Sequence, residues 1–310
     1  MAEALAAVTG ATGFLGRRLV PALIAAGWRV RVLARRPAVD LWGDGVAPEQ
    51  IVGDLGDRAA LEDLASGAEV VIHGAGLIKA KDRAAFFEVN RDGATAMARA
   101  TGDARMIFIS SLAAREPSLS DYAASKRAGE EAARAVLGDR LMVIRPPAIY
   151  GPGDRETLSL FQLAAASPIM PLPSSTATRL ALAHVDDVAA LVIDQTKRAW
   201  TPGTFAAGGA RPEGYGWREI FGAAANAMGR SPTLVPLPDW LIRGAAALSE
   251  GAGWFRGAPA IFNRGKAREL LHPDWSVSTA EQLPARSTPD RDIRTGFDQT
   301  VAWYRAARWL

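Results

Sequence analysis

A glycine-rich turn directly after the first apolar run constrains the fold of this chain more than any other feature. The apolar run covers residues 5–8, the turn reads Thr9-Gly10-Ala11-Thr12-Gly13-Phe14-Leu15-Gly16, and an amphipathic stretch follows over 17–26. Glycines between a strand and a helix permit a tight turn, and they let backbone N–H groups approach a pyrophosphate at the helix N-terminus. We expect a dinucleotide to contact Gly10, Thr12, Gly13, Phe14, Leu15 and Gly16; the alternative is a glycine turn without a ligand.

Short apolar runs alternate with helical patterns through the first half of the chain. Runs typical of buried strands cover 5–8, 28–33, 70–73, 105–109 and 140–144, and amphipathic stretches cover 17–26, 86–100 and 122–137. Such alternation is typical of parallel strands joined by helical crossovers. The sequence therefore predicts an α/β fold, a doubly wound parallel sheet of the Rossmann type with helices on both faces.

The pattern changes after Arg145, where a loop rich in proline and glycine covers 146–154. Seven of the nine tryptophans follow residue 199, so the second half also differs in composition. We expect a dinucleotide-binding domain over 1–154, to which 183–208 returns through a helix that starts near His184-Val185-Asp186-Asp187-Val188. The remaining segments, 155–182 and 209–310, are expected to form a smaller C-terminal α/β substrate lobe.

Composition excludes several classes of function. The chain has no cysteine and three scattered histidines, so it cannot form a disulfide or a thiolate site, and we expect no metal. Its net charge of +3 provides no basic field for nucleic acid. No apolar run reaches the ~18 residues of a membrane span, and the N-terminus lacks the pattern of a signal peptide. A cytoplasmic location is the expectation.

A tyrosine and a lysine stand four residues apart in the run Asp121-Tyr122-Ala123-Ala124-Ser125-Lys126. The chain has only four tyrosines and five lysines, so a chance pair at this spacing is rare. At positions i and i+4 of a helix the two side chains share one face. A nearby ammonium lowers the pKa of a phenol and makes it a usable general acid at neutral pH. An incidental pair on an exposed helix is the alternative interpretation.

Two further polar residues are candidates for the same site. Ser111 follows an apolar strand and is expected to face the crevice beyond the strand's carboxyl end, where its hydroxyl could hold a carbonyl oxygen. Asn90, on the preceding helix, could bind a backbone carbonyl or a water behind Lys126. Taken alone, Ser111 is more typical of a turn residue, and Asn90 is equally typical of a helix surface.

Cofactor preference is expected to depend on the end of the second strand, which reads Leu33-Ala34-Arg35-Arg36-Pro37. An acid would bind a ribose 2′-hydroxyl there, whereas Arg35 and Arg36 suit a 2′-phosphate, so NADP(H) is favoured over NAD(H). Solvated surface charges are the alternative. Asp54 could accept a hydrogen bond from the adenine amine or cap its own loop. We interpret His73 as structural, and residues 74–76 as a close backbone approach to the cofactor.

As a set, these motifs resemble the short-chain dehydrogenase/reductase superfamily in its extended branch, the NAD-dependent epimerase/dehydratase type. The resemblance covers most of the first two-thirds of the chain. It implies a triad of Ser111, Tyr122 and Lys126, with Asn90 as a fourth catalytic residue. It also implies cofactor contacts from Tyr122 and Lys126 themselves and from Asp54, Leu55, Gly74, Ala75, Gly76, Pro146 and Ile149.

Within this branch three functions remain open, namely a sugar-nucleotide enzyme, a ketone reductase and a non-catalytic nucleotide-binding module. Sugar-nucleotide enzymes commonly carry Gly-x-Gly and an arginine before the His-Val-Asp-Asp element, whereas this chain has residues 173–183 without that pattern and only Arg179 to meet a phosphate. A non-catalytic NADPH-binding module, similar to the accessory subunit of respiratory complex I, is the third interpretation. Monomer and homodimer also remain open.

The second half points instead to a lipophilic substrate. It carries the apolar residues Trp240, Leu241, Ile242, Leu248, Trp254, Phe255, Ile261 and Phe262. Such residues could pack in a core, line an apolar pocket or lie against the inner face of a membrane as a peripheral contact. We therefore expect an NADP(H)-dependent reductase of a lipophilic ketone, similar to bacterial reductases of sterol-like or sphingoid and ceramide 3-oxo lipids.

Overall fold

The computed structural model describes residues 4–38, 41–43, 47–256, 263–283 and 290–310. The chain forms two compact units, the first from Met1–Arg145 and Val188–Phe205, the second from Pro146–Asp187 and Ala206–Leu310. The sequence instead predicts that the first domain ends at residue 154 and that residues 183–208 return to it. Two of the apolar residues it names, Ile261 and Phe262, lie outside the described residues.

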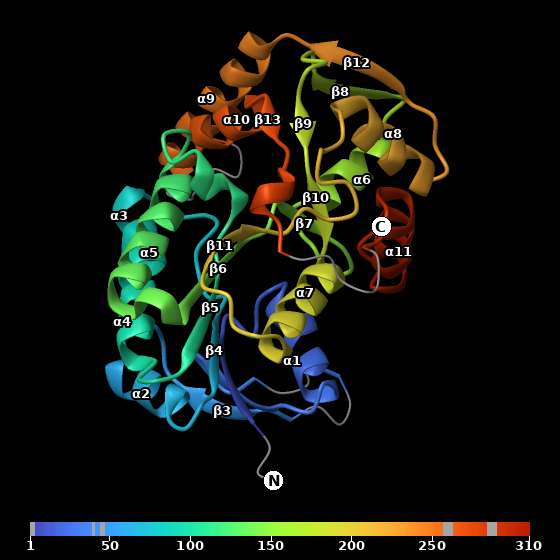
Figure 1. Ribbon diagram of the computed structural model, residues 1–310. Coiled ribbons are helices and arrows are strands. Elements are labelled where there is room, and N and C mark those ends of the chain that lie inside the picture. The colour runs from blue at the N-terminus through green and yellow to red at the C-terminus, as the bar shows by residue number, and fades with distance from the viewer. Residues whose placement is uncertain (1–3, 39–40, 44–46, 257–262, 284–289) are drawn as a thin grey trace. The chain divides into compact units, whose positions relative to one another are not determined.

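A seven-stranded sheet forms the centre of the first unit (Figure 1). Its strands are β1 (Leu5–Thr9), β2 (Arg29–Ala34), β3 (Glu49–Val52), β4 (Val70–His73), β5 (Arg105–Ile109), β6 (Leu141–Arg145) and β11 (Gly203–Ala206). Their order is β11-β6-β5-β4-β1-β2-β3, and the neighbours from β6 to β3 pair in parallel. The chain changes direction across the sheet between β1 and β4, which is where such sheets bind their ligands.

Helices cover both faces of this sheet, as the sequence predicts. One face carries α2 (Arg58–Ala65), α3 (Arg83–Phe87), α4 (Gly93–Ala100) and α5 (Asp121–Leu137), and the other carries α1 (Gly16–Ala25) and α7 (Val185–Lys197) (Figure 1). The core below the first group contains Val71, Met97, Met106, Phe108 and Leu141, all with exposed fractions near zero. The predicted doubly wound α/β fold is therefore confirmed.

One predicted helix is interrupted. The amphipathic stretch 86–100 forms α3, then a π-helical turn over Glu88–Asp92, and then α4. Single π-turns inside α-helices are frequent at functional sites. This turn carries Asn90, whose exposed fraction is only 1%.

Local sequence explains the limits of α5, the helix that carries Tyr122 and Lys126. The Ser120 side chain caps its N-terminus by accepting from the Ala123 backbone N–H at 3.0 Å, and Asp121 places an acid in the first turn. Gly138 ends the helix with φ of 55°, a conformation that favours glycine. The buried face of α5 includes Ser125, Lys126 and Glu130, so this helix turns polar side chains inward.

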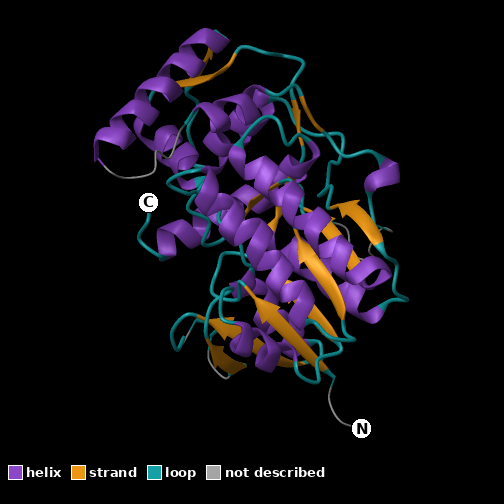
Figure 2. Ribbon diagram, turned by 90° about the vertical axis from the view of Figure 1, so that its left-hand side faces the viewer, coloured by secondary structure: helices purple, strands orange, loops and turns teal. Residues whose placement is uncertain are grey.

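The second unit contains smaller sheets and five helices among its described residues (Figure 2). Its strands pair as β7 (Ala148–Tyr150) with β10 (Leu182–His184), β8 (Ile169–Pro173) with β12 (Thr233–Leu237), and β9 (Arg179–Leu180) with β13 (Asp274–Trp275). Its helices are α6 (Leu158–Ala166), α8 (Trp217–Ala227), α9 (Asp239–Arg256), α10 (Arg264–Leu271) and α11 (Ile293–Ala306).

Aromatic side chains form the core of the second unit. Phe161 lies 5.1 Å from Phe297 and 5.7 Å from Tyr304 between ring centroids, each pair in an edge-to-face arrangement. Tyr304 donates a hydrogen bond of 2.5 Å to the carbonyl of Asp154. The core therefore holds together by ring packing, and the Tyr304 hydroxyl at its edge is satisfied. Among the described residues, no helix combines the length and apolarity needed to cross a membrane.

Candidate active site

The glycine turn after β1 leaves room only for backbone. A Cβ added to Gly10 would lie 2.5 Å from the carbonyl carbon of Gly74, and Gly10 has φ of +74°. A Cβ on Gly16 would lie 2.2 Å from the Gly10 carbonyl oxygen. The absence of side chains thus lets the backbones at the ends of β1 and β4 lie close together. The turn leads directly into the N-terminus of α1, where free N–H groups favour an anion.

A polar contact below this turn joins β1 to β4. The Thr9 hydroxyl lies 2.8 Å from Nδ1 of His73 and accepts from the Ala75 backbone N–H at 3.2 Å. Burial, with a smaller contribution from the Lys126 charge, lowers the pKa of His73 to about 3, so its ring is neutral. His73 thus aligns the loop over residues 74–76 and cannot act as an acid at neutral pH.

Asn90 connects the β4 loop to α5. Its side chain accepts from the Leu77 backbone N–H at 2.7 Å and donates to the Leu77 carbonyl at 3.0 Å and to the Ser125 hydroxyl at 2.9 Å. The two elements approach closely because Gly129 lacks a side chain: a Cβ there would lie 2.3 Å from the Asn90 carbonyl oxygen. Asn90 is therefore a buried connector and not a helix-surface residue.

Lys126 is buried at the carboxyl end of β5. Its Nζ donates to the Ile109 carbonyl at 2.9 Å and lies 4.7 Å from the Phe108 ring centroid. A Cβ on Gly76 would be 3.7 Å from the same Nζ, so the lysine head also borders the β4 loop. Burial lowers the pKa of Lys126 to about 8, against an opposing effect from Glu130. The ammonium form therefore predominates at pH 7 and can donate further hydrogen bonds.

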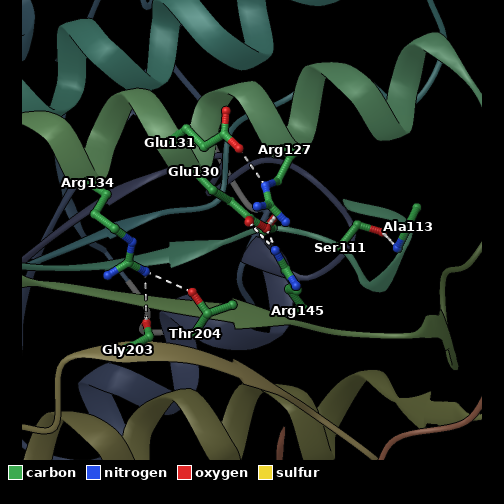
Figure 3. A network of polar contacts seen from close by, with 10 residues as sticks. Ser111, Ala113, Arg127, Glu130, Glu131, Arg134, Arg145, Gly203 and Thr204 are labelled. Carbon is green, nitrogen blue, oxygen red and sulfur yellow. Dashed lines mark hydrogen bonds and ion pairs between the residues drawn. The ribbon is translucent and has the colours of Figure 1, made fainter. Parts of the chain in front are cut away.

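Ser111 and Tyr122 both precede this lysine in the chain. Ser111 caps the short 3-10 helix Leu112–Arg115, which packs against α5, and its hydroxyl accepts from the Ala113 N–H at 3.2 Å (Figure 3). That bond leaves the hydroxyl hydrogen able to donate. Tyr122 lies one turn before Lys126 on α5, half-buried, with its ring 6.2 Å from that of Phe86.

A buried ion pair that the sequence analysis missed supports the same region (Figure 3). Glu130 accepts two hydrogen bonds from Arg145, of 2.9 and 2.5 Å, and one of 2.5 Å from the Ser110 hydroxyl. The pair links α5, the end of β6 and the residue before Ser111. A sequence signal existed, since Glu130 follows Lys126 by one helical turn on the face expected to be buried.

The candidate residues for the adenosine end lie at the surface. Arg35 and Arg36 are exposed just after β2, and neither forms an ion pair with another described residue. Asp54 is exposed after β3 and accepts from the Gly56 N–H at 2.8 Å, so it caps its own loop with one oxygen. The Leu55 side chain packs toward α4, where a Cβ on Gly93 would lie 2.6 Å from it. The predicted contact of Leu55 with a cofactor stays a prediction.

Pro146 and Ile149 lie in the second unit, beginning where β6 ends. Pro146 is buried, and Ile149 is half-buried on β7, opposite Ala183 on β10. Their predicted contact with a nicotinamide stays a prediction.

A nicotinamide dinucleotide fits the features of the first unit. The cradle between Gly10 and Gly74 would be filled by any side chain, the N-terminus of α1 follows it, and Lys126 retains donors next to the β4 loop. The two exposed arginines Arg35 and Arg36 provide cations at the carboxyl end of β2 in the same sheet. Among the described residues no group of histidines and acids could hold a metal ion.

Comparison with known proteins agrees with this arrangement. Residues 6–208 match the NAD dependent epimerase/dehydratase family, and the chain belongs to this family, the extended branch of the short-chain dehydrogenase/reductases. A ceramide reductase from Caulobacter vibrioides is 52% identical over 315 residues, covering 100% of this chain and 97% of the relative. A 2-alkyl-3-oxoalkanoate reductase from Stenotrophomonas maltophilia is 28% identical over 95% of this chain and 98% of its own.

A solved structure extends the likeness to the whole fold. The UDP-glucose 4-epimerase of Thermus thermophilus, in complex with NAD, has a TM-score of 0.71 at 22% identity, covering 98% of this chain and 99% of its own. At this level of identity the similarity concerns the fold alone. Family and fold thus confirm the resemblance on which the sequence analysis relies.

Proposed function

We propose that this protein is an NADP(H)-dependent oxidoreductase that reduces a ketone on a long-chain lipid to a secondary alcohol, or catalyses the reverse reaction. The observation that carries the proposal is the buried Lys126 ammonium, which is fixed to the Ile109 carbonyl between the β4 loop and the segment that leads to Ser111. Two relatives that span nearly the full chain are named as a ceramide reductase and a 3-oxoalkanoate reductase, which supports a 3-oxo lipid as the substrate.

In the proposed mechanism each polar residue has one task. A reduced nicotinamide held by the glycine turn and the β4 loop would supply the hydride that the carbonyl carbon receives. Ser111 donates its hydroxyl hydrogen to the carbonyl oxygen, and Tyr122 transfers its phenolic proton to the oxygen as negative charge develops there. Lys126 favours the phenolate that this transfer leaves behind. Asn90 holds Ser125 and the Leu77 backbone, and so keeps α5 and the β4 loop in register.

Replacing Tyr122 by Phe tests this mechanism. The phenyl ring keeps the contact with Phe86 but has no proton to donate, so kcat with a long-chain 3-oxo lipid is expected to fall about 100- to 10,000-fold. The affinity for NADPH, measured by its fluorescence on binding, is expected to stay within about threefold. Turnover at the wild-type rate would refute the role of Tyr122.

The preference for NADP(H) rests on Arg35 and Arg36, because bidentate contacts to a 2′-phosphate are the strongest that this edge of the sheet offers. Replacing Arg35 by Ser is expected to weaken NADPH binding at least tenfold and to leave NADH binding nearly unchanged. Arg230→Ser is the control, since it removes an exposed guanidinium from the loop after α8 in the second unit. Equal losses for both cofactors in Arg35→Ser would rule out the assigned contact.

A sugar-nucleotide epimerase or dehydratase is the alternative that the family name keeps open. Arg179, the candidate for a diphosphate, uses its Nη1 to donate to the carbonyls of Thr176 and Thr178 in its own loop. That bonding favours a structural role. Thermal stabilisation by UDP or dTDP, without stabilisation by 3-oxo lipids in the presence of NADPH, would support the alternative.

A non-catalytic NADPH-binding module would need the cofactor cradle but not the lysine and its partners. The burial of Lys126, Asn90 and Glu130 in one connected region favours catalysis, because buried polar groups without a task are costly. Binding of NADPH without turnover of any ketone, lipid or nucleotide sugar would favour the module.

We also propose that the protein contacts a membrane surface through α9. Trp240 and Leu248 are 69% and 79% exposed and stand two helical turns apart, so they share one face with the exposed Arg243. An apolar face with a cation suits an anionic bilayer. In sedimentation with phosphatidylglycerol vesicles, the wild type is expected in the pellet with the vesicles and the Trp240→Ser/Leu248→Ser variant in the supernatant. Equal amounts of both proteins in the pellet would rule out this surface. The side chains of Trp254 and Phe255 lie outside the described part of the helix.

A further inference from the structure

An apolar pocket of about 260 Å³ lies within the second unit. Its described walls come from β8, the end of β12 and the helices α8, α9 and α10, and the surface that these residues present to the pocket is almost entirely apolar. None of the described lining residues is charged. Apolar ligands bury their surface favourably against such walls.

The helices α8 and α9 provide the key positions of the pocket. Trp217 and Phe221 stand one turn apart on α8, with their rings edge-to-face at 6.1 Å. On α9, Ile242 is buried whereas Leu241 and Ala245 line the pocket and also reach solvent. Because Ala245 has only a methyl group, the pocket meets the surface at α9.

One residue of the pocket wall also carries an unused donor. Trp217 is 7% exposed, and its Nε1 has no hydrogen-bond partner among the described residues. Buried indole N–H groups normally find an acceptor. This nitrogen is itself covered by protein, so the lining that a ligand would meet at Trp217 is apolar, which suits a hydrocarbon chain.

We propose that this pocket binds the hydrocarbon chain of the lipid ketone, an inference that rests on the proposed function. Its volume corresponds to about nine methylene groups if each occupies the ~30 Å³ of a water molecule in the liquid. A nucleoside diphosphate finds no charged partner in these walls. The pocket would thus select a long acyl or alkyl chain and discriminate against nucleotide sugars.

Chain length is the first test. In a series of 3-oxo compounds, KM is expected to fall about fourfold for each added methylene until the pocket is full, which corresponds to ~0.8 kcal/mol for each buried methylene. Ala245→Leu places a larger side chain at the opening, and it is expected to raise KM for the longest chains at least tenfold while leaving the shortest chains unaffected. Gly244→Leu is the matched control, because its neighbouring position on α9 does not line the pocket and faces open space.

Direct binding separates the pocket from the chemistry. A bromine-labelled fatty chain is expected to quench part of the tryptophan fluorescence, and Trp217→Phe is expected to remove that part. Quenching without turnover of any ketone would keep the pocket and refute the proposed function. Turnover without chain-length dependence, together with no quenching that Trp217→Phe removes, would overturn the pocket and leave the proposed function standing. Equal effects of Ala245→Leu and Gly244→Leu on KM would also overturn it.

Discussion

The two units differ in what their helices bury. In the first unit, α5 buries Ser125, Lys126 and Glu130, and each of them forms hydrogen bonds to groups on other elements. In the second unit, α8 buries Trp217, Ile220 and alanines against aromatic rings. Buried polar groups are costly unless they are satisfied, so a helix that retains several marks a site of chemistry. Apolar residues of α8, α9 and α10 line a pocket instead, which suits selection of a substrate.

The largest expected effect concerns the buried ion pair of the first unit. Glu130→Gln removes the partner of Arg145, whose side chain is only 14% exposed, and is expected to lower the free energy of unfolding by about 3–5 kcal/mol. The double variant Glu130→Gln/Arg145→Met is expected to recover part of this loss, because it leaves no unpaired charge. Urea unfolding measures both. If Glu130→Gln lowers the free energy of unfolding by less than about 1 kcal/mol, the pair behaves like a surface ion pair. The buried polar groups of α5 would then not distinguish the first unit from the second.

The same substitution in a helix of each unit should have opposite effects. Gly129→Ala on α5 places a Cβ 2.3 Å from the Asn90 carbonyl oxygen and is expected to cost about 1–3 kcal/mol of stability and at least tenfold in kcat. Gly222→Ala on α8 meets no atom within 4 Å and is expected to stabilise the protein by up to about 1 kcal/mol. Thermal unfolding and turnover of the two variants provide the check. Similar behaviour of both would contradict the close packing of α5.

A conservative change in the aromatic core should affect stability alone. Phe161→Leu removes the edge-to-face contacts with Phe297 and Tyr304 but keeps an apolar side chain, so a loss of about 1 kcal/mol is expected. The affinity for NADPH is expected to stay constant, because its proposed contacts lie mainly in the first unit. Isothermal titration of NADPH into wild type and variant tests this. A tenfold loss of affinity would link this core to the cofactor site.

The smallest effect is a pH dependence of the first unit. Lys126 has a pKa of about 8, and its ammonium is the proposed active form, so kcat/KM for NADPH is expected to decline as pH rises through about 8. Since Glu130 raises this pKa, Glu130→Gln is expected to shift the decline to lower pH.

The effect on stability has the opposite sign. Between about pH 8 and the lysine's ordinary value of 10.5, the unfolded chain binds more protons at this group than the native protein, so its contribution to stability increases with pH. A profile of kcat/KM that is flat up to pH 9 would remove Lys126 from the mechanism.

Much of the first unit could be predicted because its signals are local. Apolar runs gave strands such as β4 and β5 at the expected residues, and the capping Ser120 with Gly138 fits the limits of α5. The predicted helix 86–100 is interrupted by a π-turn, and at this turn the Asn90 backbone lies close to Gly129, 39 positions away in sequence. Periodicity cannot register such a contact.

Residue type and short spacing were enough to predict the alternation of strands and helices, the glycine turn and the candidates Tyr122, Lys126 and Ser111. The folded chain was needed to show that Lys126 bonds to the Ile109 carbonyl, that Glu130 pairs with Arg145, and that an apolar pocket with an unsatisfied indole N–H exists in the second unit. These features join residues from separate strands and helices. Their energies depend on burial and distance, which arise when the chain packs and have no counterpart in a local pattern.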